Sequence, residues 1–558
     1  MEEQTPILDN VSASYYASAE FSTAIGGFLA YSGVFPNVDY RLVLLGAMVA
    51  AFILQMTYDF VIFPYMLSSL KHLPKVKGRM NVVKTLFETP RGKSALHWLR
   101  TVPNDGLIAF DYLPKQTYLM ATSHQALLDI MSTRTYDFEK PWRFRDFLAR
   151  IIGFGLILSE GDPHKAQRKA VNPSFNVKNI RALYNLMWEK TGIFLEQLEG
   201  EIHNNPVKTL HGKGKMGRVE MTVWASRLTL DIIGPTAMGR DFQSLTSKEN
   251  RVADVFLNIL EPTWEKLFFL SVNFLLPQWF TTKIPWHLNK VVSDDVGYLR
   301  SLCHEIVQEK RASFKGKNLE KSSLETDILG TLIVRGDFSD SELVDQMLTF
   351  LAAGHETTAG ALTMACWMLC LHPDVQTRLR EEIRSHIPSA DSPITWSDLE
   401  SLPVLNGVCQ EILRLWPTVP VTIREAIRET EVAGTRIHRG TRIILCPYAI
   451  NRSPDFWGET ANEFIPERWI DFDESGKQTV NHHGGASTNY AQITFLHGQR
   501  SCIGKDFSRA ELRCAVAGLI GRFAMEMQDP TGDVTLSGAV TVKPIEGLHL
   551  KMTRVSGW

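Results

Sequence analysis

The most specific chemistry in this sequence centres on one cysteine. Residues 495–504 read Phe-Leu-His-Gly-Gln-Arg-Ser-Cys-Ile-Gly, and Cys502 lies near their end. A cysteine binds a metal as its thiolate, which is a minor form of a free cysteine at neutral pH. Backbone N–H donors and the N-terminus of a helix that starts at Gly504 would both favour the negative charge. We therefore predict that Cys502 is a thiolate ligand.

The residues around Cys502 suit a flat iron-porphyrin. Gly498 and Gly504 allow the backbone to approach a macrocycle closely, and Phe495 can shield the sulfur from water. Arg500 can reach an acidic substituent of the ring through a charge-assisted hydrogen bond. A chance match to Phe-x-x-Gly-x-Arg-x-Cys-x-Gly is expected in roughly one of 10⁴ chains of this size. We predict a haem b cofactor with Cys502 as the axial iron ligand.

A second motif places an acid beside an alcohol inside a long predicted helix. The apolar pattern predicts a helix over residues 340–370, and residues 353–358 of it read Ala-Gly-His-Glu-Thr-Thr. The small Ala-Gly pair would leave room for dioxygen beside the helix. An acid next to a hydroxyl can relay protons, which makes Glu356 and Thr357 candidate catalytic residues. A polar helix kink is the alternative.

Together these motifs make the sequence resemble the cytochrome P450 superfamily of haem-thiolate monooxygenases over about residues 70–555. The overall pattern is similar to fungal microsomal members, which are often found in secondary metabolism. The resemblance implies a mainly α-helical fold with small β-sheets, in the α+β class, behind an N-terminal transmembrane anchor. It also implies that Glu356 and Thr357 deliver protons during oxygen chemistry at the haem.

Charged residues elsewhere match further parts of the family pattern. Glu411 and Arg414 share one face of a predicted helix over residues 404–415, and Arg468 follows in a Pro-Glu-Arg-Trp segment. The resemblance implies that these three residues form a buried structural charge network behind the haem. Taken alone, the Glu-x-x-Arg spacing is more typical of a solvated pair.

Three other residues match positions that bind the haem propionates in the family. The resemblance implies that His164 and Arg168, one helical turn apart, meet one propionate, although His stands where many members have Trp. It implies the same kind of contact for Arg424. A surface salt bridge is the alternative interpretation of Arg424.

The first eighty residues differ in character from the rest. Residues 42–54 are continuously apolar, and the stretch from 42 to 65 is long enough to predict a transmembrane helix. A buried core helix or a signal peptide is the alternative. Acidic residues precede the stretch and lysines follow it, which predicts a lumenal tail over residues 1–41 and a cytosolic C-terminal part. Residues 66–80 are interpreted as a hinge and residues 81–558 as the haem-binding monooxygenase domain.

This topology predicts a single-pass protein of the endoplasmic reticulum membrane with a cytosolic catalytic domain. Residues 21–36 are also apolar and could form a second span, which would return the N-terminus to the cytosol. Asn10 begins a glycosylation sequon, so the protein would be a glycoprotein only if the tail is lumenal.

Composition excludes several other classes. The 558 residues are 44% apolar and 22% charged, with a net charge of −2, which excludes a mainly nucleic-acid-binding chain. The seven cysteines form no Cys-x-x-Cys pair and indicate reduced thiols. Periodicity predicts helices over residues 177–203, 221–238, 250–260, 293–315, 373–387 and 504–520, and strands over 107–112, 117–121, 431–437 and 441–445.

The reaction implied by the resemblance is insertion of one atom of dioxygen into a lipophilic small molecule. No flavin or dinucleotide fingerprint occurs in the sequence, so electrons should come from a separate NADPH-cytochrome reductase. A cationic face with Lys165, Lys169, Lys505 and Arg509 could dock this partner or simply be solvated. The aromatic-rich residues 255–286 would cover the substrate chamber and touch the bilayer, or belong to the core.

Two other functions stay open at this point. The same haem could serve an isomerase or dehydratase without a redox partner, or a membrane haem sensor without turnover. The acid–alcohol pair at Glu356 and Thr357 disfavours both alternatives.

Overall fold

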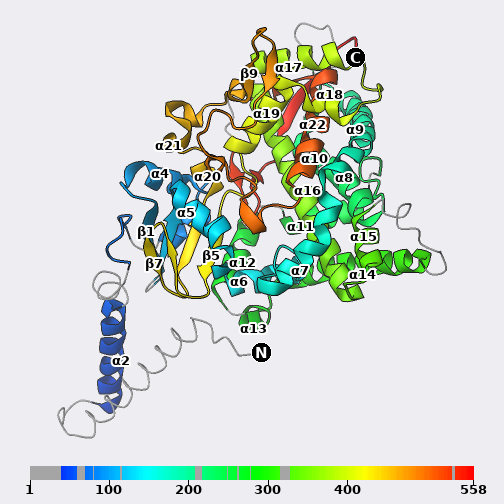
Figure 1. Cartoon of the computed structure of the whole chain (residues 1–558). Coiled ribbons are helices and arrows are strands. Elements are labelled where there is room, and N and C mark those ends of the chain that lie inside the picture. The colour runs from blue at the N-terminus through cyan, green and yellow to red at the C-terminus, as the bar shows by residue number, and fades with distance from the viewer. Residues whose placement is uncertain are drawn as a thin grey trace.

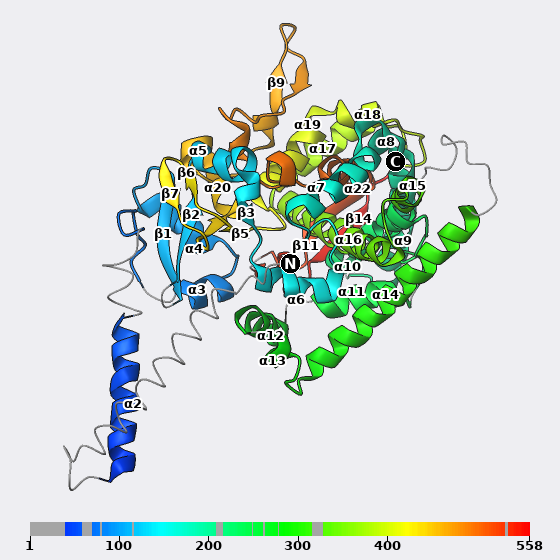
Figure 2. The same cartoon turned by 60° about the horizontal axis from the view of Figure 1, so that its bottom comes forward.

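Helices supply most of the architecture, and the strands form small sheets beside them. A computed structural model describes residues 39–58, 70–78, 81–113, 116–207, 216–247, 249–260, 263–276, 278–314, 327–530, 534–538 and 540–558. Figure 1 and Figure 2 show the strand-rich part of the body on one side of the long helices. This arrangement confirms the predicted helix-dominated fold with small sheets.

The elements of the body follow one another through mostly short connections. The helices are α3 (Asn81–Phe87), α4 (Lys93–Thr101), α5 (His124–Leu128), α6 (Trp142–Ile152), α7 (Gly161–Val171), α8 (Val177–Ala182), α9 (Tyr184–Asn204), α10 (Met221–Ile233), α11 (Arg251–Leu260), α12 (Trp264–Leu275), α13 (Gln278–Thr281), α14 (His287–Phe314), α15 (Ile328–Arg335), α16 (Asp340–Leu371), α17 (Pro373–His386), α18 (Trp396–Glu400), α19 (Pro403–Leu415), α20 (Pro447–Ile450), α21 (Pro454–Trp457) and α22 (Lys505–Arg522). The strands are β1 (Leu107–Leu113), β2 (Gln116–Ala121), β3 (Phe138–Glu139), β4 (Met216–Glu220), β5 (Thr422–Ala426), β6 (Thr430–Val432), β7 (Thr435–Ile437), β8 (Arg442–Leu445), β9 (Ile470–Phe472), β10 (Gln478–Val480), β11 (Phe523–Met527), β12 (Leu536–Ser537), β13 (Lys543–Pro544) and β14 (His549–Arg554).

The long helix α16 carries the acid–alcohol motif through the middle of the helical part. Its start is fixed by a capping box, in which Ser339 Oγ accepts from the Glu342 N–H at 3.3 Å and the Glu342 carboxylate accepts from the Ser339 N–H at 2.8 Å. The helix ends at Leu371, and Pro373, two residues later, opens α17. Most side chains of α16 are buried on every side, so the helix is a rigid support for Glu356 and Thr357.

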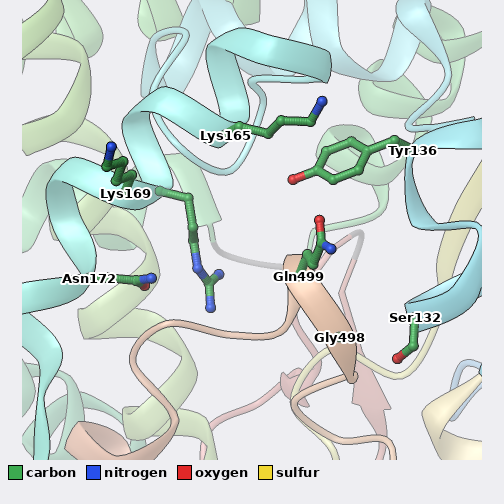
Figure 3. A pocket seen from close by; sticks show the side chains of 8 residues that line it. Ser132, Tyr136, Lys165, Lys169, Asn172, Gly498 and Gln499 are labelled. Carbon is green, nitrogen blue, oxygen red and sulfur yellow. The ribbon is translucent and has the colours of Figure 1, made fainter.

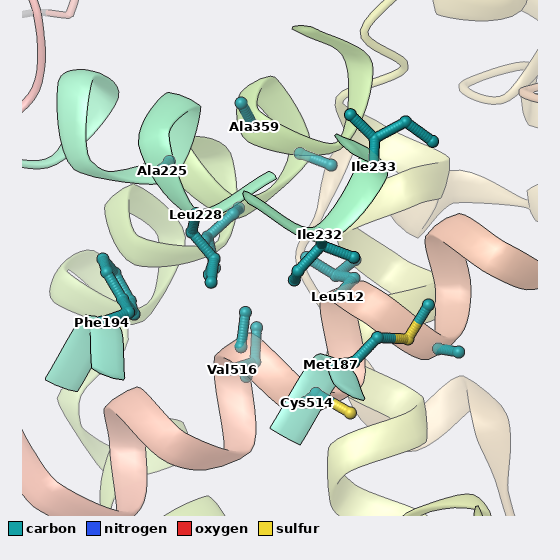
Figure 4. Packing of buried hydrophobic residues seen from close by; sticks show 14 of the residues in the cluster. Met187, Phe194, Ala225, Leu228, Ile232, Ile233, Ala359, Leu512, Cys514 and Val516 are labelled. Carbon is teal, nitrogen blue, oxygen red and sulfur yellow. The ribbon is translucent and has the colours of Figure 1, made fainter. Parts of the chain in front are cut away.

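The helices α9, α10, α16 and α22 contribute to one large apolar core, part of which Figure 4 shows. Burial of one such aliphatic side chain stabilises the fold by about 1.5–3 kcal/mol. A Cβ at Gly354 of α16 would lie only 2.7 Å from Ile233 Cδ1 of α10, so Gly354 is required by this helix contact. The side chains that meet in the core include Met187 and Phe194 of α9, Leu228, Ile232 and Ile233 of α10, Ala359 of α16, and Leu512 and Val516 of α22.

Among the described strands, five form a sheet in the order β1-β2-β8-β5-β3. β2 and β8 are parallel, with Leu119 opposite Ile443, whereas β5 and β8 are antiparallel, with Arg424 opposite Ile443. The predicted strands at 107–112, 117–121 and 441–445 are confirmed. The predicted strand over 431–437 is instead the hairpin β6–β7, because Ala433 and Gly434 turn the chain with positive φ angles of 47° and 76°.

The remaining small sheets join distant parts of the chain. The strands β11, β14 and β4 form a sheet in that order, which joins the C-terminal strand β14 to β4 at Met216–Glu220. β9 pairs with β10, and β12 pairs with β13. The β12–β13 hairpin contacts the segment before β5. In this contact the Val542 N–H donates to Thr418 O at 2.9 Å.

The predicted transmembrane helix over residues 42–65 is not found. The helix α2 (Tyr40–Thr57) has 18 residues, a length of about 27 Å against a hydrocarbon core of about 30 Å. Within the ranges that the structure describes, no helix is long and apolar enough to cross a membrane. Residues 59–69, which hold the end of the predicted span, lie outside the described residues, as do residues 1–38 with Asn10 and the second apolar stretch at 21–36.

Part of the predicted hinge over residues 66–80 packs on the sheet. The Val76 N–H donates to Ala109 O at 2.8 Å, and the Ala109 N–H donates to Pro74 O at 2.8 Å. Lys75 also forms an ion pair with Asp111 at 2.8 Å. These contacts join the described residues 70–78 to β1, N-terminal to the boundary predicted at residue 81.

Candidate active site

The loop before α22 brings Cys502 to the start of that helix. The Cys502 N–H donates to Phe495 O at 2.8 Å, which closes the loop around Gly498. Gly498 has a φ of 71°, and a Cβ there would lie 1.9 Å from Met131 O, so no other residue fits. Gly504 precedes α22, as predicted, and a Cβ at Gly504 would lie 4.0 Å from Cys502 Sγ.

Cys502 combines an exposed residue with a partly desolvated sulfur. The residue is exposed to solvent, whereas the surrounding protein desolvates the thiol and raises its pKa above the ordinary value. The Gly504 N–H and the charges of Arg168 and Lys505 act against the rise in pKa, and they favour a thiolate.

A buried group of cations shares a single buried carboxylate near this loop. Arg500 forms an ion pair with Glu160, and both side chains are about 95% buried, with exposures of 5% and 4%. The Lys140 N–H and Nζ donate to the same carboxylate at 2.9 and 3.4 Å. Burial lowers the pKa of Lys140 to about 7 and that of Arg424 to about 10. Three basic side chains therefore surround one carboxylate.

The side chains of His164 and Arg168, both on α7, contact two different partners. The Arg168 guanidinium donates to Ser501 O at 2.5 Å and so supports the backbone beside Cys502. The His164 ring lies 3.3 Å from the Tyr136 hydroxyl. Burial lowers the pKa of His164 to about 4, with the charge of Arg500 as the next cause, so its imidazole is neutral at pH 7.

The acid–alcohol pair lies on α16 as predicted, with partners that the sequence did not indicate. The Thr357 hydroxyl donates to Ala353 O at 2.7 Å, and the Thr357 carbonyl accepts from the Thr418 hydroxyl at 3.0 Å. Glu356 is 7% exposed and forms an ion pair with Lys543 of β13 at 3.1 Å. Gly354 is required by its contact with α10, and the room for dioxygen beside the Ala-Gly pair stays a prediction.

The helices of the two motifs meet beside this pair. Glu511 of α22 is fully buried next to Thr358 of α16, and burial raises the pKa of its carboxyl well above the ordinary range, against the effect of Thr358. Phe175 lies near Gly504, and its ring centroid is 5.9 Å from that of Phe350 on α16. The loop of Cys502 and the motif on α16 therefore belong to one neighbourhood.

Known proteins are similar in sequence to most of this chain. The family model described as Cytochrome P450 matches residues 95–552. The chain belongs to the cytochrome P450 family. It is 34% identical to cytochrome P450 monooxygenase sphH of Aspergillus fumigatus over 94% of this chain and 98% of that protein. It is also 34% identical to monooxygenase ALT8 of Alternaria alternata over 89% and 92%, and 33% identical to monooxygenase FUM15 of Gibberella moniliformis over 89% and 90%.

This cytochrome P450 is therefore a monooxygenase that binds haem b. Its buried charges suit that cofactor, which carries two acidic propionates. The buried basic side chains carry more positive charge than the one buried carboxylate, Glu160, can neutralise. These basic residues are Lys140, Arg424 and Arg500. Among the described residues, no partner gives the three buried guanidinium nitrogens of Arg500 a hydrogen bond of regular geometry. An acidic group beside Arg500 would supply the missing acceptors.

The structure brings together the three residues of the predicted charge network, with Glu411 and Arg414 fully buried and the Arg468 side chain 13% exposed. The Glu411 carboxylate accepts from Arg414 Nε at 2.8 Å and Nη2 at 2.6 Å, and from Trp469 Nε1 at 2.9 Å. Arg414 in turn donates to the carbonyl oxygens of residues 451, 461 and 463. Arg468 Nε lies 3.4 Å from Glu411 Oε1. The network joins α19 to the segment around residues 461–469.

A surface cavity of about 650 Å³ lies beside the Cys502 loop, and Figure 3 shows its wall. Lys165 and Lys169 project from α7 on one side, while Gln499 and Gly498 belong to the loop. Lys165 pairs with Asp162 at 2.8 Å. The lining residues are Ser132, Tyr136, Lys165, Arg168, Lys169, Asn172, Gly498 and Gln499.

The other two residues of the predicted cationic face are less available to a partner than these lysines. Burial lowers the pKa of Lys505, and it lowers the pKa of Arg509 to about 10. The Arg509 guanidinium lies 5.6 Å from the centroid of the Phe495 ring. The lysines of α7 are therefore the more accessible part of the predicted face.

Proposed function

We propose that this cytochrome P450 inserts one atom of dioxygen into a lipophilic small molecule of secondary metabolism, using electrons from a separate NADPH-cytochrome reductase. The observation that carries the proposal is the meeting of α16 and α22, which brings the Glu356–Thr357 pair and the accessible Cys502 into one neighbourhood. An isomerase or dehydratase would need no acid–alcohol pair on that helix. A haem carrier without turnover would not need one either.

Each part of the site has a role in this proposal. Cys502 would hold the haem, which would supply dioxygen activation. Lys140, Arg424 and Arg500 would hold its propionates, and Arg168 holds the backbone next to Cys502. The Glu356 carboxyl and the Thr357 hydroxyl hold and move protons on the α16 side of the chamber.

Isotope labelling tests the proposed reaction. The protein is incubated with NADPH, a fungal reductase, ¹⁸O₂ and candidate terpenoid, polyketide or alkaloid precursors. We expect a product that carries one labelled oxygen atom, and mass spectrometry measures it. An unlabelled product that forms without NADPH would instead indicate an isomerase or dehydratase.

Replacement of Thr357 by alanine tests the proton role separately. The hydroxyl is removed while the helix is kept, so we expect product per NADPH to fall and hydrogen peroxide per NADPH to rise, with catalysis lower by roughly 10²-fold. The control is Thr363→Ala, because the Thr363 hydroxyl makes the same kind of bond, to Ala359 O at 2.8 Å on α16. Equal ratios in both variants would contradict the role of Thr357.

We also propose membrane association at the endoplasmic reticulum, with the catalytic domain in the cytosol. Aromatic residues of α12 and α13 that belong to the predicted 255–286 region are exposed: Trp264 is 64%, Phe268 56% and Trp279 68% exposed. The helix α2, which lies outside the body in Figure 1, also exposes apolar side chains such as Phe52. Exposed apolar patches of this kind suit a bilayer surface and a lipophilic substrate.

Reductase docking is proposed for the α7 face beside the cavity of Figure 3. Lys165 and Lys169 are exposed there, one helical turn apart. We expect Lys169→Glu to slow the first reduction of the haem by about tenfold at low salt, because the variant repels an acidic partner. Stopped-flow reduction at two salt concentrations measures this, with Lys178→Glu on α8 as the control. An unchanged rate at low salt would contradict docking on this face.

A further inference from the structure

The acid on α16 is held by a hairpin from the C-terminal part of the chain. Glu356 Oε1 lies 3.1 Å from Lys543 Nζ and accepts a bond from the Thr541 hydroxyl at 3.4 Å. Both charged residues are almost buried, with exposures of 7% and 8%. Both of these contacts with the Glu356 side chain therefore come from residues 541–543, in and just before β13.

The hairpin has a defined shape and is tied to the same turn of α16. Ser537 of β12 pairs with Lys543, and Gly538 is required because a Cβ there would lie 1.7 Å from Thr541 O. The Val542 N–H donates to Thr418 O at 2.9 Å, and the Thr418 hydroxyl donates to Thr357 O at 3.0 Å. Thr418 thus connects the hairpin to the residue that follows Glu356.

Lys543 is the cation that faces the carboxylate. His355, the neighbour of Glu356 on α16, is fully buried, and burial lowers the pKa of its imidazole to about 4. His355 is therefore neutral at pH 7, and its Nε2 lies 2.6 Å from the Ser226 hydroxyl. A buried ion pair is costly to desolvate and is a weak source of stability, so its geometry is a better explanation of its presence than its energy.

We propose that Lys543 is the positioning residue for Glu356: its ammonium group fixes where the carboxylate stands on α16, so that the acid is aligned with Thr357 for proton transfer. The inference rests on the proposed proton role of Glu356. It adds a residue from outside α16 that contacts the acid directly, and it makes proton delivery depend on the β12–β13 hairpin.

The experiment uses the purified, haem-loaded full chain in the variants Lys543→Met, Lys543→Arg, Glu356→Gln and the double variant Glu356→Gln/Lys543→Met. One readout is the C–O stretching band of the reduced protein with carbon monoxide as the probe, which needs no turnover. The other is NADPH oxidation with a fungal reductase in H₂O and D₂O, without added substrate. Lys190→Met is the matched control, because Lys190 of α9 is 6% exposed and pairs with Asp241, rather than with Glu356, at 2.6 Å.

We expect Lys543→Met to shift or split the C–O band and to slow NADPH oxidation about tenfold with a larger solvent isotope effect, since small misplacements of reacting groups cost this much or more. Lys543→Arg should restore most of both signals, and Lys190→Met should change neither. The double variant should be no slower than Glu356→Gln, and it should be more stable to urea than Lys543→Met, because it leaves no buried carboxylate unpaired.

Three results would overturn the inference, and they are distinguishable. If Glu356→Gln changes both signals and Lys543→Met changes neither, Lys543 does not position the acid, while the proposed function stands. If Lys190→Met has the same effects as Lys543→Met, the loss of any buried lysine causes these changes, and Lys543 has no special role. If Glu356→Gln leaves both signals unchanged, the proposed proton role of Glu356 fails, and the inference fails with it.

Discussion

Replacement of Cys502 by serine is expected to remove the thiolate-type Soret band of the reduced carbon monoxide complex and to abolish product formation. A serine hydroxyl stays protonated near neutral pH, so it cannot replace a thiolate that donates electron density to iron. The local fold should survive, because the backbone N–H of residue 502 still donates to Phe495 O and α22 still begins after Gly504. Difference spectra and haem content measure the result.

The control for this prediction is Cys303→Ala. Cys303 is fully buried in α14, and burial raises the pKa of its thiol to about 12, so it is a structural thiol that cannot serve as a thiolate at pH 7. We expect Cys303→Ala to bind haem and to keep the thiolate-type band. A Cys502→Ser variant that kept this band would show that the ligand is another residue.

The motifs of this cytochrome P450 could be predicted from the sequence because their chemistry is local. Cys502 and its glycines lie within ten residues, and the acid and alcohol are adjacent on a helix whose bounds were predicted within one residue. Glu411 and Arg414 are also close in sequence, at the i, i+3 spacing of one helix. Patterns of this kind report residue types and spacing, which folding does not change.

Contacts between distant segments could not be predicted in the same way. Thr541 and Glu356 are 185 residues apart, and no pattern links the β12–β13 hairpin to α16. Glu160, which neutralises part of the charge of Arg500, and Glu511, which is buried beside Thr358, carry no signature that separates them from solvated acids. Only an excess of apolar neighbours around Glu511 in α22 could have indicated its burial.

Two predictions differed from the structure for identifiable physical reasons. Hydropathy averages over a window of residues and predicts a span to residue 65, whereas α2 ends at Thr57 and residues 59–69 lie outside the described residues. The predicted strand over 431–437 is a hairpin, because its residue pattern does not reveal that Ala433 and Gly434 turn the chain with positive φ angles.

Replacement of Glu411 by alanine is expected to give protein that lacks haem and unfolds easily. The change removes an acceptor of two bonds from Arg414 and one each from the Ile465 N–H and Trp469 Nε1. Arg414, itself 0% exposed, keeps its charge with only carbonyl partners. Removing one partner of a buried ion pair lowers the free energy of unfolding by about 3–5 kcal/mol. The whole free energy of unfolding of a folded protein is roughly 5–15 kcal/mol, so this loss is a large fraction of it.

A matched pair of variants separates this effect from the loss of any glutamate. Glu467→Ala removes a carboxylate in the same segment of the fold, but its ion pair with Arg378 is about half exposed, with side-chain exposures of 47% and 46%, so the cost should stay below about 1 kcal/mol. Glu411→Gln should still be strongly destabilised, because its amide presents donors to the donors of Arg414. Urea unfolding and haem content decide the matter, and normal values for Glu411→Ala would mean that the network does not support the haem side of the fold.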